Sequence, residues 1–133
     1  MLEPDPRGSR LTGMRVLLVE DDLFQLDACR RALEALGCAV SVAASAEAGI
    51  ELARSSPFDA ILTDNILSGM TGLRSIVEYA IATRSPIFLM TSHFSAEVEK
   101  DALLVGARRV FAKPLVWDDI ALELASVRGL KVL

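Results

Sequence analysis

The chain has 133 residues, enough for one domain with one core and too few for two domains of ordinary size. Its 52% hydrophobic and 24% charged residues are typical of a globular protein and exclude a disordered one. The formal net charge of −4 predicts no general attraction to nucleic-acid phosphates, and therefore no direct DNA binding.

The first segment, residues 1–13, contains two prolines and two glycines and no apolar stretch of the signal-peptide kind. We expect it to be a flexible leader before one folded domain at 14–128, followed by a tail at 129–133. No apolar run approaches the roughly 18 residues of a membrane span. These features predict a cytoplasmic protein without a membrane partner.

From Met14 onward, short apolar runs alternate with longer segments of helical period. The runs predict five strands, at Arg15–Val19, Ala39–Ala43, Ala60–Thr63, Ile87–Met90 and Val110–Ala112. The central runs are almost continuously apolar, which is typical of strands buried on both faces of a parallel sheet.

Five helices are expected between and after these strands. They are the segment bearing Leu26 to Leu36, then Ser45–Arg54, Leu73–Thr83 and Ser95–Val105, and a last helix after Pro114 that carries Asp118 and Asp119. Repeated strand–helix units predict an α/β three-layer sandwich built on a five-stranded parallel sheet. Such sheets bind ligands beyond the carboxyl ends of their strands.

Acidic residues follow the first strand and the third. Glu20, Asp21 and Asp22 are consecutive carboxylates that repel one another, and a divalent cation such as Mg²⁺ relieves this repulsion. A helix cap with solvated acids explains the same three residues about equally well. Asp64 closes the third strand before the segment Asn65–Gly72, which we expect to be a long loop, so its carboxylate is free to face the first cluster as a nucleophile.

The fourth predicted strand is followed by the hydroxyls of Thr91 and Ser92, and the fifth by Lys113 and Pro114. Each of these is common in proteins and weak evidence alone. Together with the two acidic sites they supply a nucleophile, metal ligands, a hydroxyl donor and a cation. This set is what phosphoryl transfer requires.

In these motifs the sequence resembles the receiver domains of bacterial response regulators, over about Met14 to Val127. The motifs are Val-Glu-Asp-Asp at 19–22, Thr-Asp-Asn-Ile-Leu-Ser-Gly-Met-Thr-Gly at 63–72, Met-Thr-Ser at 90–92, Gly-Ala at 106–107 and Lys-Pro at 113–114. The resemblance implies a flavodoxin-like sheet of strand order 2-1-3-4-5. It also implies a switch that acts in a two-component or phosphorelay system.

The resemblance assigns a role to each matching residue. Asp64 is expected to accept a phosphoryl group from a phosphohistidine of a histidine kinase or histidine phosphotransfer protein. Mg²⁺ (or Mn²⁺) is expected to bind Asp21, Asp64 and the backbone carbonyl of Ile66, with Glu20 acting through a metal-bound water. Lys113 is expected to hold the phosphoryl oxygens and Thr91 to act as the switch hydroxyl, whereas Asp22 is expected to cap the first helix.

The sequence departs from the family pattern at three points. Ser68 stands where a proline is frequent, and Val110 stands where the family has its switch aromatic. Phe111 does not replace that aromatic, because strand alternation directs it to the opposite face. We expect no effector domain after residue 128, since the remaining residues are too few to fold alone, and therefore expect output through an unidentified downstream protein.

Two further sets of residues carry expectations. Ile66, Ser92 and His93 are expected to border the phosphoryl group, and apolar Ile66 predicts slow self-dephosphorylation. His93 is otherwise interpreted as an ordinary loop histidine. Leu103 and Leu104 are expected to point partly outward from the fourth helix, where they would suit a weak dimer or simply be scattered surface leucines.

Two alternatives remain open beside the switch. A Mg²⁺-dependent phosphatase acting through an aspartyl phosphate shares the chemistry, but the Asp-x-Asp signature after the first strand and a cap domain are missing. A degenerate receiver serving as an unphosphorylated interaction module fits Val110 but not the complete set of acids, hydroxyl and lysine. Nucleotide-binding glycine motifs are absent from the sequence.

Overall fold

The structure is a computed structural model that describes residues 11–67 and 70–128, with the main chain alone at Ile66 and Leu67. Its centre is a parallel sheet of five strands: β1 (Arg15–Val19), β2 (Ala39–Ala43), β3 (Ala60–Asp64), β6 (Ile87–Thr91) and β7 (Arg109–Ala112). The order is β2-β1-β3-β6-β7, which is 2-1-3-4-5 when these strands are counted along the chain. The predicted fold class and strand order are confirmed.

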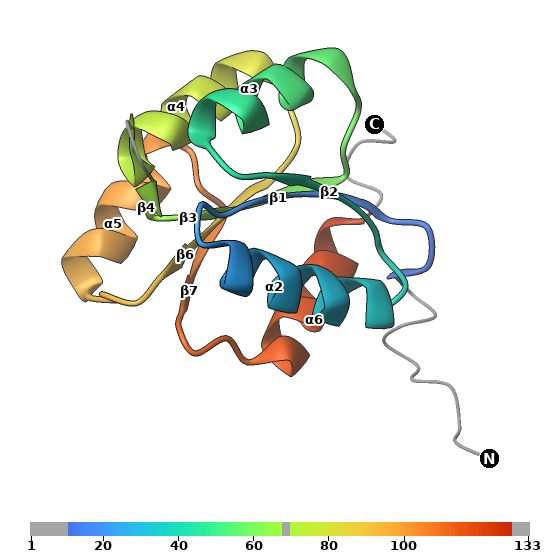
Figure 1. The fold of residues 1–133 in the computed structure, drawn as a ribbon. Coiled ribbons are helices and arrows are strands. Elements are labelled where there is room, and N and C mark those ends of the chain that lie inside the picture. Colours follow the sequence, from blue (N-terminus) through green and yellow to red (C-terminus); the bar gives the residue numbers. More distant parts are fainter. Residues whose placement is uncertain (1–10, 68–69, 129–133) are drawn as a thin grey trace.

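Helices cover both faces of the sheet. One face carries α2 (Leu23–Ala35) and α6 (Trp117–Val127), and the other carries α3 (Ala46–Ser55), α4 (Gly72–Ala82) and α5 (Ala96–Val105) (Figure 1). β3 and β6 are buried at every position, because helices lie over both of their faces. This explains why their sequences are continuously apolar rather than alternating.

Two core clusters lie on opposite sides of the sheet, and β7 shows how alternation divides them. Phe111 packs with the residues that face α2 and α6, where it stacks on Phe88 with ring centroids 5.8 Å apart. Val110 packs in the cluster that faces α3, α4 and α5. The expectation that Phe111 points away from the position of Val110 is therefore confirmed.

Side-chain caps begin the helices at the residues that favour them. The carboxylate of Asp22 accepts hydrogen bonds from the main-chain nitrogens of Phe24 and Gln25, at 2.9 and 3.1 Å, and starts α2 as expected. Ser45 and Ser95 cap α3 and α5 in the same way. The helix of α2 therefore begins directly after the acidic triplet and holds it at the end of β1.

The segment after Asp64 is not a simple loop, which corrects our expectation. It contains a two-stranded antiparallel hairpin, β4 (Ile66–Leu67) with β5 (Met70–Thr71), and α4 begins at Gly72. Strands of two residues are too short to produce a readable hydrophobic period. Ser68 lies outside the described residues, so its expected effect on this segment stays a prediction.

The start of the folded domain also differs from expectation. Leu11 is fully buried with Met14 in the cluster under α2 and α6, although we assigned residues 1–13 to a leader. A single leucine among glycines and prolines carries no periodic signal. Residues 1–10 and 129–133 lie outside the described residues, and the leader and tail expected there stay predictions.

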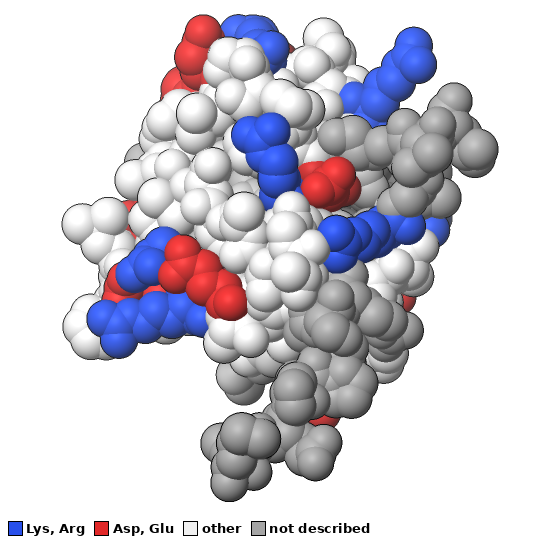
Figure 2. Space-filling view, turned by 90° about the vertical axis from the view of Figure 1, so that its right-hand side faces the viewer, with Lys and Arg blue, Asp and Glu red and all other residues white. Residues whose placement is uncertain are grey.

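In Figure 2, lysines and arginines are interspersed with acids and uncoloured surface. None of the described helices is both long and apolar enough to span a membrane.

Cys29 and Cys38 are buried free thiols, and burial raises the pKa of Cys38 to about 11.

Gly49 in α3 predicts an unusual response to alanine. A Cβ at this position would overlap the hydroxyl of Tyr79 and lie 2.9 Å from Val19 Cγ2. We expect Gly49→Ala to lower the free energy of unfolding by about 1–3 kcal/mol, although alanine normally stabilises a helix interior. Urea unfolding measures the change.

Tyr79→Phe provides the control for this clash. The Tyr79 hydroxyl is buried and has no hydrogen-bond partner among the described residues. The neighbouring Thr63 hydroxyl donates instead to the main-chain oxygen of Asp64. Removal of the Tyr79 hydroxyl is therefore expected to be neutral or stabilising. In that background Gly49→Ala should destabilise less, and an unchanged loss would contradict the proposed contact.

Candidate functional site

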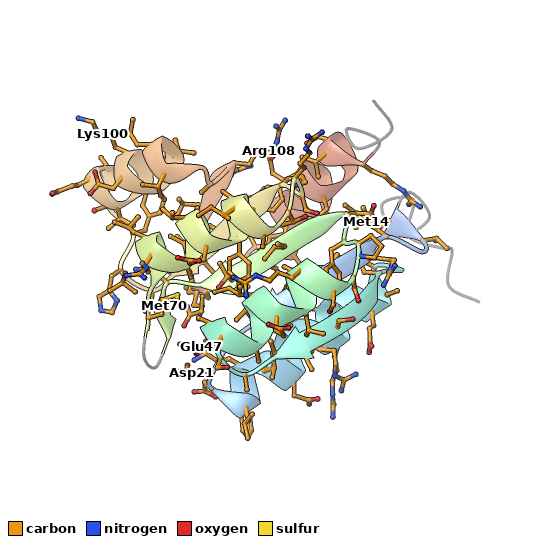
Figure 3. All side chains as sticks on the ribbon, turned by 90° about the horizontal axis from the view of Figure 1, so that it is seen from above. Met14, Asp21, Glu47, Met70, Lys100 and Arg108 are labelled. Carbon is orange, nitrogen blue, oxygen red and sulfur yellow. The ribbon has the colours of Figure 1, made fainter. Side chains whose placement is uncertain are left out.

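The carboxyl ends of β1, β3, β6 and β7 meet at one edge of the sheet. Figure 3 shows Asp21, which follows β1, on the same side as Met70 of the hairpin and far from Met14, which precedes β1. The register pairs Val19 with Thr63, Asp64 with Met90, and Thr91 with Ala112. These pairings place the residues after β1, β6 and β7 beside Asp64.

Three carboxylates gather at this edge. Glu20, Asp21 and Asp64 each offer an oxygen, and these oxygens all lie within 4.8 Å of one another. Glu20 is 1% exposed, and its Oε2 has no hydrogen-bond partner among the described residues. A hard divalent cation, or a water molecule bound to one, satisfies a buried carboxylate oxygen of this kind, so this set fits Mg²⁺.

Lys113 supplies the positive charge. Its Nζ lies 2.9 Å from Asp64 Oδ1 and 3.1 Å from Glu20 Oε1, and its side chain is only 15% exposed. Burial alone would lower the pKa of Lys113, but hydrogen bonds and charges from Asp64 and Glu20 outweigh it and raise the pKa above its usual value. The lysine therefore stays charged against two carboxylates.

Glu20 is electrostatically perturbed in the metal-free site. Burial, reinforced by the neighbouring Asp64 carboxyl, raises the pKa of Glu20 to about 7, although Lys113 acts in the opposite direction. Without a bound cation, burial at this edge therefore favours the protonated form of Glu20.

The hydroxyl of Thr91 lies at the end of β6 and is 1% exposed. Its Oγ1 accepts hydrogen bonds from the main-chain nitrogen of His93, at 3.0 Å, and from Asn65 Nδ2, at 3.4 Å. Ser92 and His93 are exposed and contact each other, with Ser92 Oγ 3.2 Å from His93 Nδ1. The structure thus brings Thr91 to the site and leaves the Ser92 and His93 side chains at its rim.

Two contacting residues escaped the sequence analysis. Gln25 Oε1 accepts a hydrogen bond from Lys113 Nζ at 2.7 Å, and Asn65 donates to Thr91. Gln25 lies one helical turn after the N-cap Asp22, with which its amide also interacts at 3.4 Å. Neither residue type is distinctive in sequence, but the position of Asn65 directly after Asp64 was an available signal.

The remaining expected residues lie as follows. The main chain of Ile66 forms β4 at this edge, but its side chain lies outside the described residues. Val110 is 4% exposed and belongs to the core rather than to the rim. Leu103 and Leu104 are 45% and 74% exposed on α5, so the expectation that they point outward is confirmed.

Comparison with known proteins agrees with this geometry. Residues 16–125 match the model of the response regulator receiver domain family. The chain is 30% identical over 115 residues to the transcriptional regulatory protein QseB of Escherichia coli O157:H7, covering 86% of this chain and 52% of QseB. It thus spans about half the length of this relative, and a smaller share of other curated regulators that it matches.

Solved structures show the same fold. A CheY-like receiver domain protein from Methanospirillum hungatei aligns with a TM-score of 0.80 at 26% identity, covering 90% of this chain and 99% of that one. The receiver domain of the sensor histidine kinase PA1611 from Pseudomonas aeruginosa, described with a magnesium ion in its active-site cleft, aligns with a TM-score of 0.78 at 25% identity, covering 89% and 99%. From its fold, its edge of acids and lysine, and the family match over most of its length, this chain belongs to the response regulator receiver domain family.

Proposed function

We propose that this chain is a phosphorylation-dependent switch of a two-component system or phosphorelay, which accepts a phosphoryl group on Asp64. The donor is a phosphohistidine of a histidine kinase or histidine phosphotransfer protein. The observation that carries the proposal is the contact of Lys113 with both Asp64 and Glu20 beside a three-carboxylate cluster. This function belongs to a signalling family and not to a conventional metabolic enzyme family.

The transfer forms one bond and breaks one. A carboxylate oxygen of Asp64 attacks phosphorus as the phosphorus–nitrogen bond of the donor histidine breaks, and the donor imidazole leaves with the bonding electron pair. Lys113 Nζ lies 2.9 Å from Asp64 Oδ1. Its positive charge neutralises the carboxylate before the transfer and the phosphoryl oxygens after it. The buried hydroxyl of Thr91 donates its hydrogen to a phosphoryl oxygen.

Mg²⁺, or Mn²⁺, is the cofactor of this proposal. Asp21, Asp64 and the main-chain carbonyl of Ile66 would hold it, with Glu20 acting through a bound water. When bound, the cation neutralises charge on the incoming phosphoryl group. Support comes from the buried oxygen of Glu20 without a partner, and from the related PA1611 domain, whose description names a coordinated magnesium ion.

The rim residues modulate the lifetime of the phosphorylated state. Ile66, Ser92 and His93 are the positions from which side chains orient or exclude a hydrolytic water, and an apolar Ile66 favours slow dephosphorylation. Because Val110 is small, buried and aliphatic, the signal leaves the site without the family's aromatic rotation. Thr91 and its loop carry it instead.

The partners beyond the phosphodonor stay predictions. We further expect output through a downstream protein, a cytoplasmic location, no direct DNA binding by this domain and a weak dimer through Leu103 and Leu104. Substituting both leucines by glutamate is the direct check of the dimer. QseB is named a transcriptional regulatory protein, and that activity is a property of the longer relative.

The test is intact-protein mass after incubation with Mg²⁺ and acetyl phosphate. We expect one added phosphoryl group per chain, dependent on Mg²⁺ and absent from Asp64→Asn. The matched control is Asp59→Asn, which changes an acid at the opposite end of β3, where its carboxylate binds the main-chain nitrogen of Arg15 at 2.8 Å. This variant should accept the phosphoryl group as the parent does.

Stoichiometry separates the alternatives. Rapid phosphate release over many turnovers under excess donor would favour the phosphatase, whereas a switch holds one phosphoryl group per chain and releases phosphate only at its slow rate of self-dephosphorylation. Absence of both an adduct and Mg²⁺-dependent beryllofluoride binding would leave the degenerate interaction module.

A further inference from the structure

The hydroxyl of Thr91 is held as an acceptor in this structure. A hydroxyl has two acceptor positions and one hydrogen to donate. The main-chain nitrogen of His93 and Nδ2 of Asn65 fill both acceptor positions. Within the described part of the chain, no residue accepts the hydrogen of this buried group, which leaves it available to an anionic oxygen.

The main chain of Asn65 is fixed beside β6. Its main-chain nitrogen donates to the oxygen of Met90 at 2.8 Å, extending the ladder between β3 and β6. On its other side lies Gly72, the first residue of α4, where a Cβ would overlap Asn65 Oδ1 and lie 2.6 Å from the Asn65 main-chain oxygen. The side-chain oxygen therefore faces Gly72 and the NH₂ group faces Thr91.

These contacts join the phosphoacceptor strand to the loop before α5. Asn65 directly follows Asp64, and its amide reaches across to the residue at the end of β6. If Thr91 moves toward a phosphoryl group on Asp64, we infer that it leaves the amide of Asn65, because the main chain of Asn65 is fixed by its hydrogen bond to Met90. The hydrogen bond between Asn65 and Thr91 would then be made only in the unphosphorylated arrangement.

From this we propose that Asn65 is a positioning residue that tethers Thr91 and its loop in the inactive conformation. The inference rests on the proposed function, since it assumes that Thr91 moves to a group on Asp64. A tether of this kind sets the conformational equilibrium before phosphorylation. Removing it raises the fraction of active conformation, and so the apparent affinity for a phosphoryl mimic.

The experiment is a titration of the Mg²⁺-loaded protein with beryllofluoride. A neutral hydrogen bond as long as 3.4 Å lies at the weak end of its class. We therefore expect Asn65→Ala to tighten the apparent Kd about threefold. Asn65→Leu, which fills the space beside Gly72 without an amide, should do the same and serves if the alanine variant is poorly folded.

Thr91→Val provides the matched background. Without the hydroxyl the tether has no acceptor, so Asn65→Ala should leave the Kd of the Thr91→Val protein unchanged. In parallel, the backbone amide signal of His93 in ¹⁵N–¹H spectra of the beryllofluoride-free Asn65→Ala protein should move toward its beryllofluoride-bound position. A purely structural role for Asn65 would not produce this directed shift.

The outcomes are distinguishable. An unchanged or weaker Kd in Asn65→Ala and Asn65→Leu, with the unsubstituted protein binding normally, overturns the tether and leaves the proposed function intact. The same tightening in the Thr91→Val background also overturns it, because the effect then does not pass through the hydroxyl. If the unsubstituted protein binds no beryllofluoride with Mg²⁺, the proposed function fails and the tether fails with it.

Discussion

Lys113→Met is expected to abolish efficient phosphorylation while strengthening Mg²⁺ binding. Loss of the ammonium group removes the positive charge that stabilises the phosphoryl oxygens during transfer. The rate of phosphorylation by acetyl phosphate should therefore fall at least about a hundredfold. The same loss removes a cation that lies 2.9 and 3.1 Å from two of the three clustered acids. Mg²⁺ no longer competes with it, so the Kd for Mg²⁺ should tighten about tenfold.

The substitution also separates the stability of the two states. In metal-free protein the buried carboxylates of Glu20 and Asp64 lose their neutralising partner, and the free energy of unfolding should fall by about 3 kcal/mol. Saturating Mg²⁺ should restore most of this loss. Calorimetric Mg²⁺ titration and urea unfolding with and without the metal measure the two effects.

Two controls define this result. Lys100→Met removes the same charge from an exposed position on α5. It should leave the phosphorylation rate, the Kd for Mg²⁺ and the free energy of unfolding unchanged. Lys113→Arg keeps the charge but not the compact ammonium geometry, and should recover only part of the rate. Weaker Mg²⁺ binding in Lys113→Met, or a phosphorylation rate within threefold of the parent, would show that the lysine does not act as described.

The affinity for Mg²⁺ is expected to fall steeply as the pH drops through 7. Glu20 has a pKa of about 7 in the metal-free site, where burial is the main cause and Asp64 adds to it. Mg²⁺ requires the carboxylate form, so affinity is fully present above this pKa and is lost below it. Between pH 8 and pH 6 the Kd should weaken about tenfold, measured by calorimetry.

Glu20→Gln tests the assignment of this titration. It should bind Mg²⁺ more weakly at pH 8 and show almost no pH dependence between pH 6 and pH 8. His93→Asn, which changes an exposed side chain at the rim and none of the acids, is measured in parallel and should keep the parental slope. A full slope in Glu20→Gln would assign the titration to another group.

The raised pKa of Glu20 gives the stability of the metal-free protein the opposite pH dependence to that of the Mg²⁺ affinity. The pKa of Glu20 is raised from 4.5 to about 7, so the folded protein holds this proton more tightly than the unfolded chain. The resulting stabilisation is complete below pH 4.5 and is lost as the pH rises through 7. With the metal removed by a chelator, the Tm of the parent should decline over this range more than that of Glu20→Gln.

The residues at the strand ends show how much of the site could be predicted from the sequence. Glu20, Asp21, Asp64, Thr91 and Lys113 were all predicted to meet, because the carboxyl ends of parallel strands share one edge. The structure places the three carboxylates together with Lys113, and Thr91 ends the strand β6 that pairs with β3. Gln25 and Asn65 were missed, since an amide side chain is neutral and common, and its importance depends on where its few donors and acceptors point.

The segment between β3 and α4 marks another limit. The sequence indicated a loop there, and the structure has the short β4–β5 hairpin. Thr71 caps α4, whose first residue, Gly72, lies so close to Asn65 that a Cβ would not fit. Leu11 likewise lies in the core, although no periodic apolar neighbours in the sequence predicted this. Both features depend on contacts between distant segments rather than on local pattern.

The hydrophobic period of the sequence therefore determined the α/β class and the sheet. The residues at the strand ends determined which acids, hydroxyl and lysine form the site. Both follow from residue type at a fixed spacing along the chain. Tertiary structure alone decided the charge balance of the site: the burial that raises the pKa of Glu20, the bridging position of Lys113, and the amide that holds Thr91. Desolvation and hydrogen bonding depend on which groups approach within a few ångströms in three dimensions, and spacing along the chain does not encode those distances.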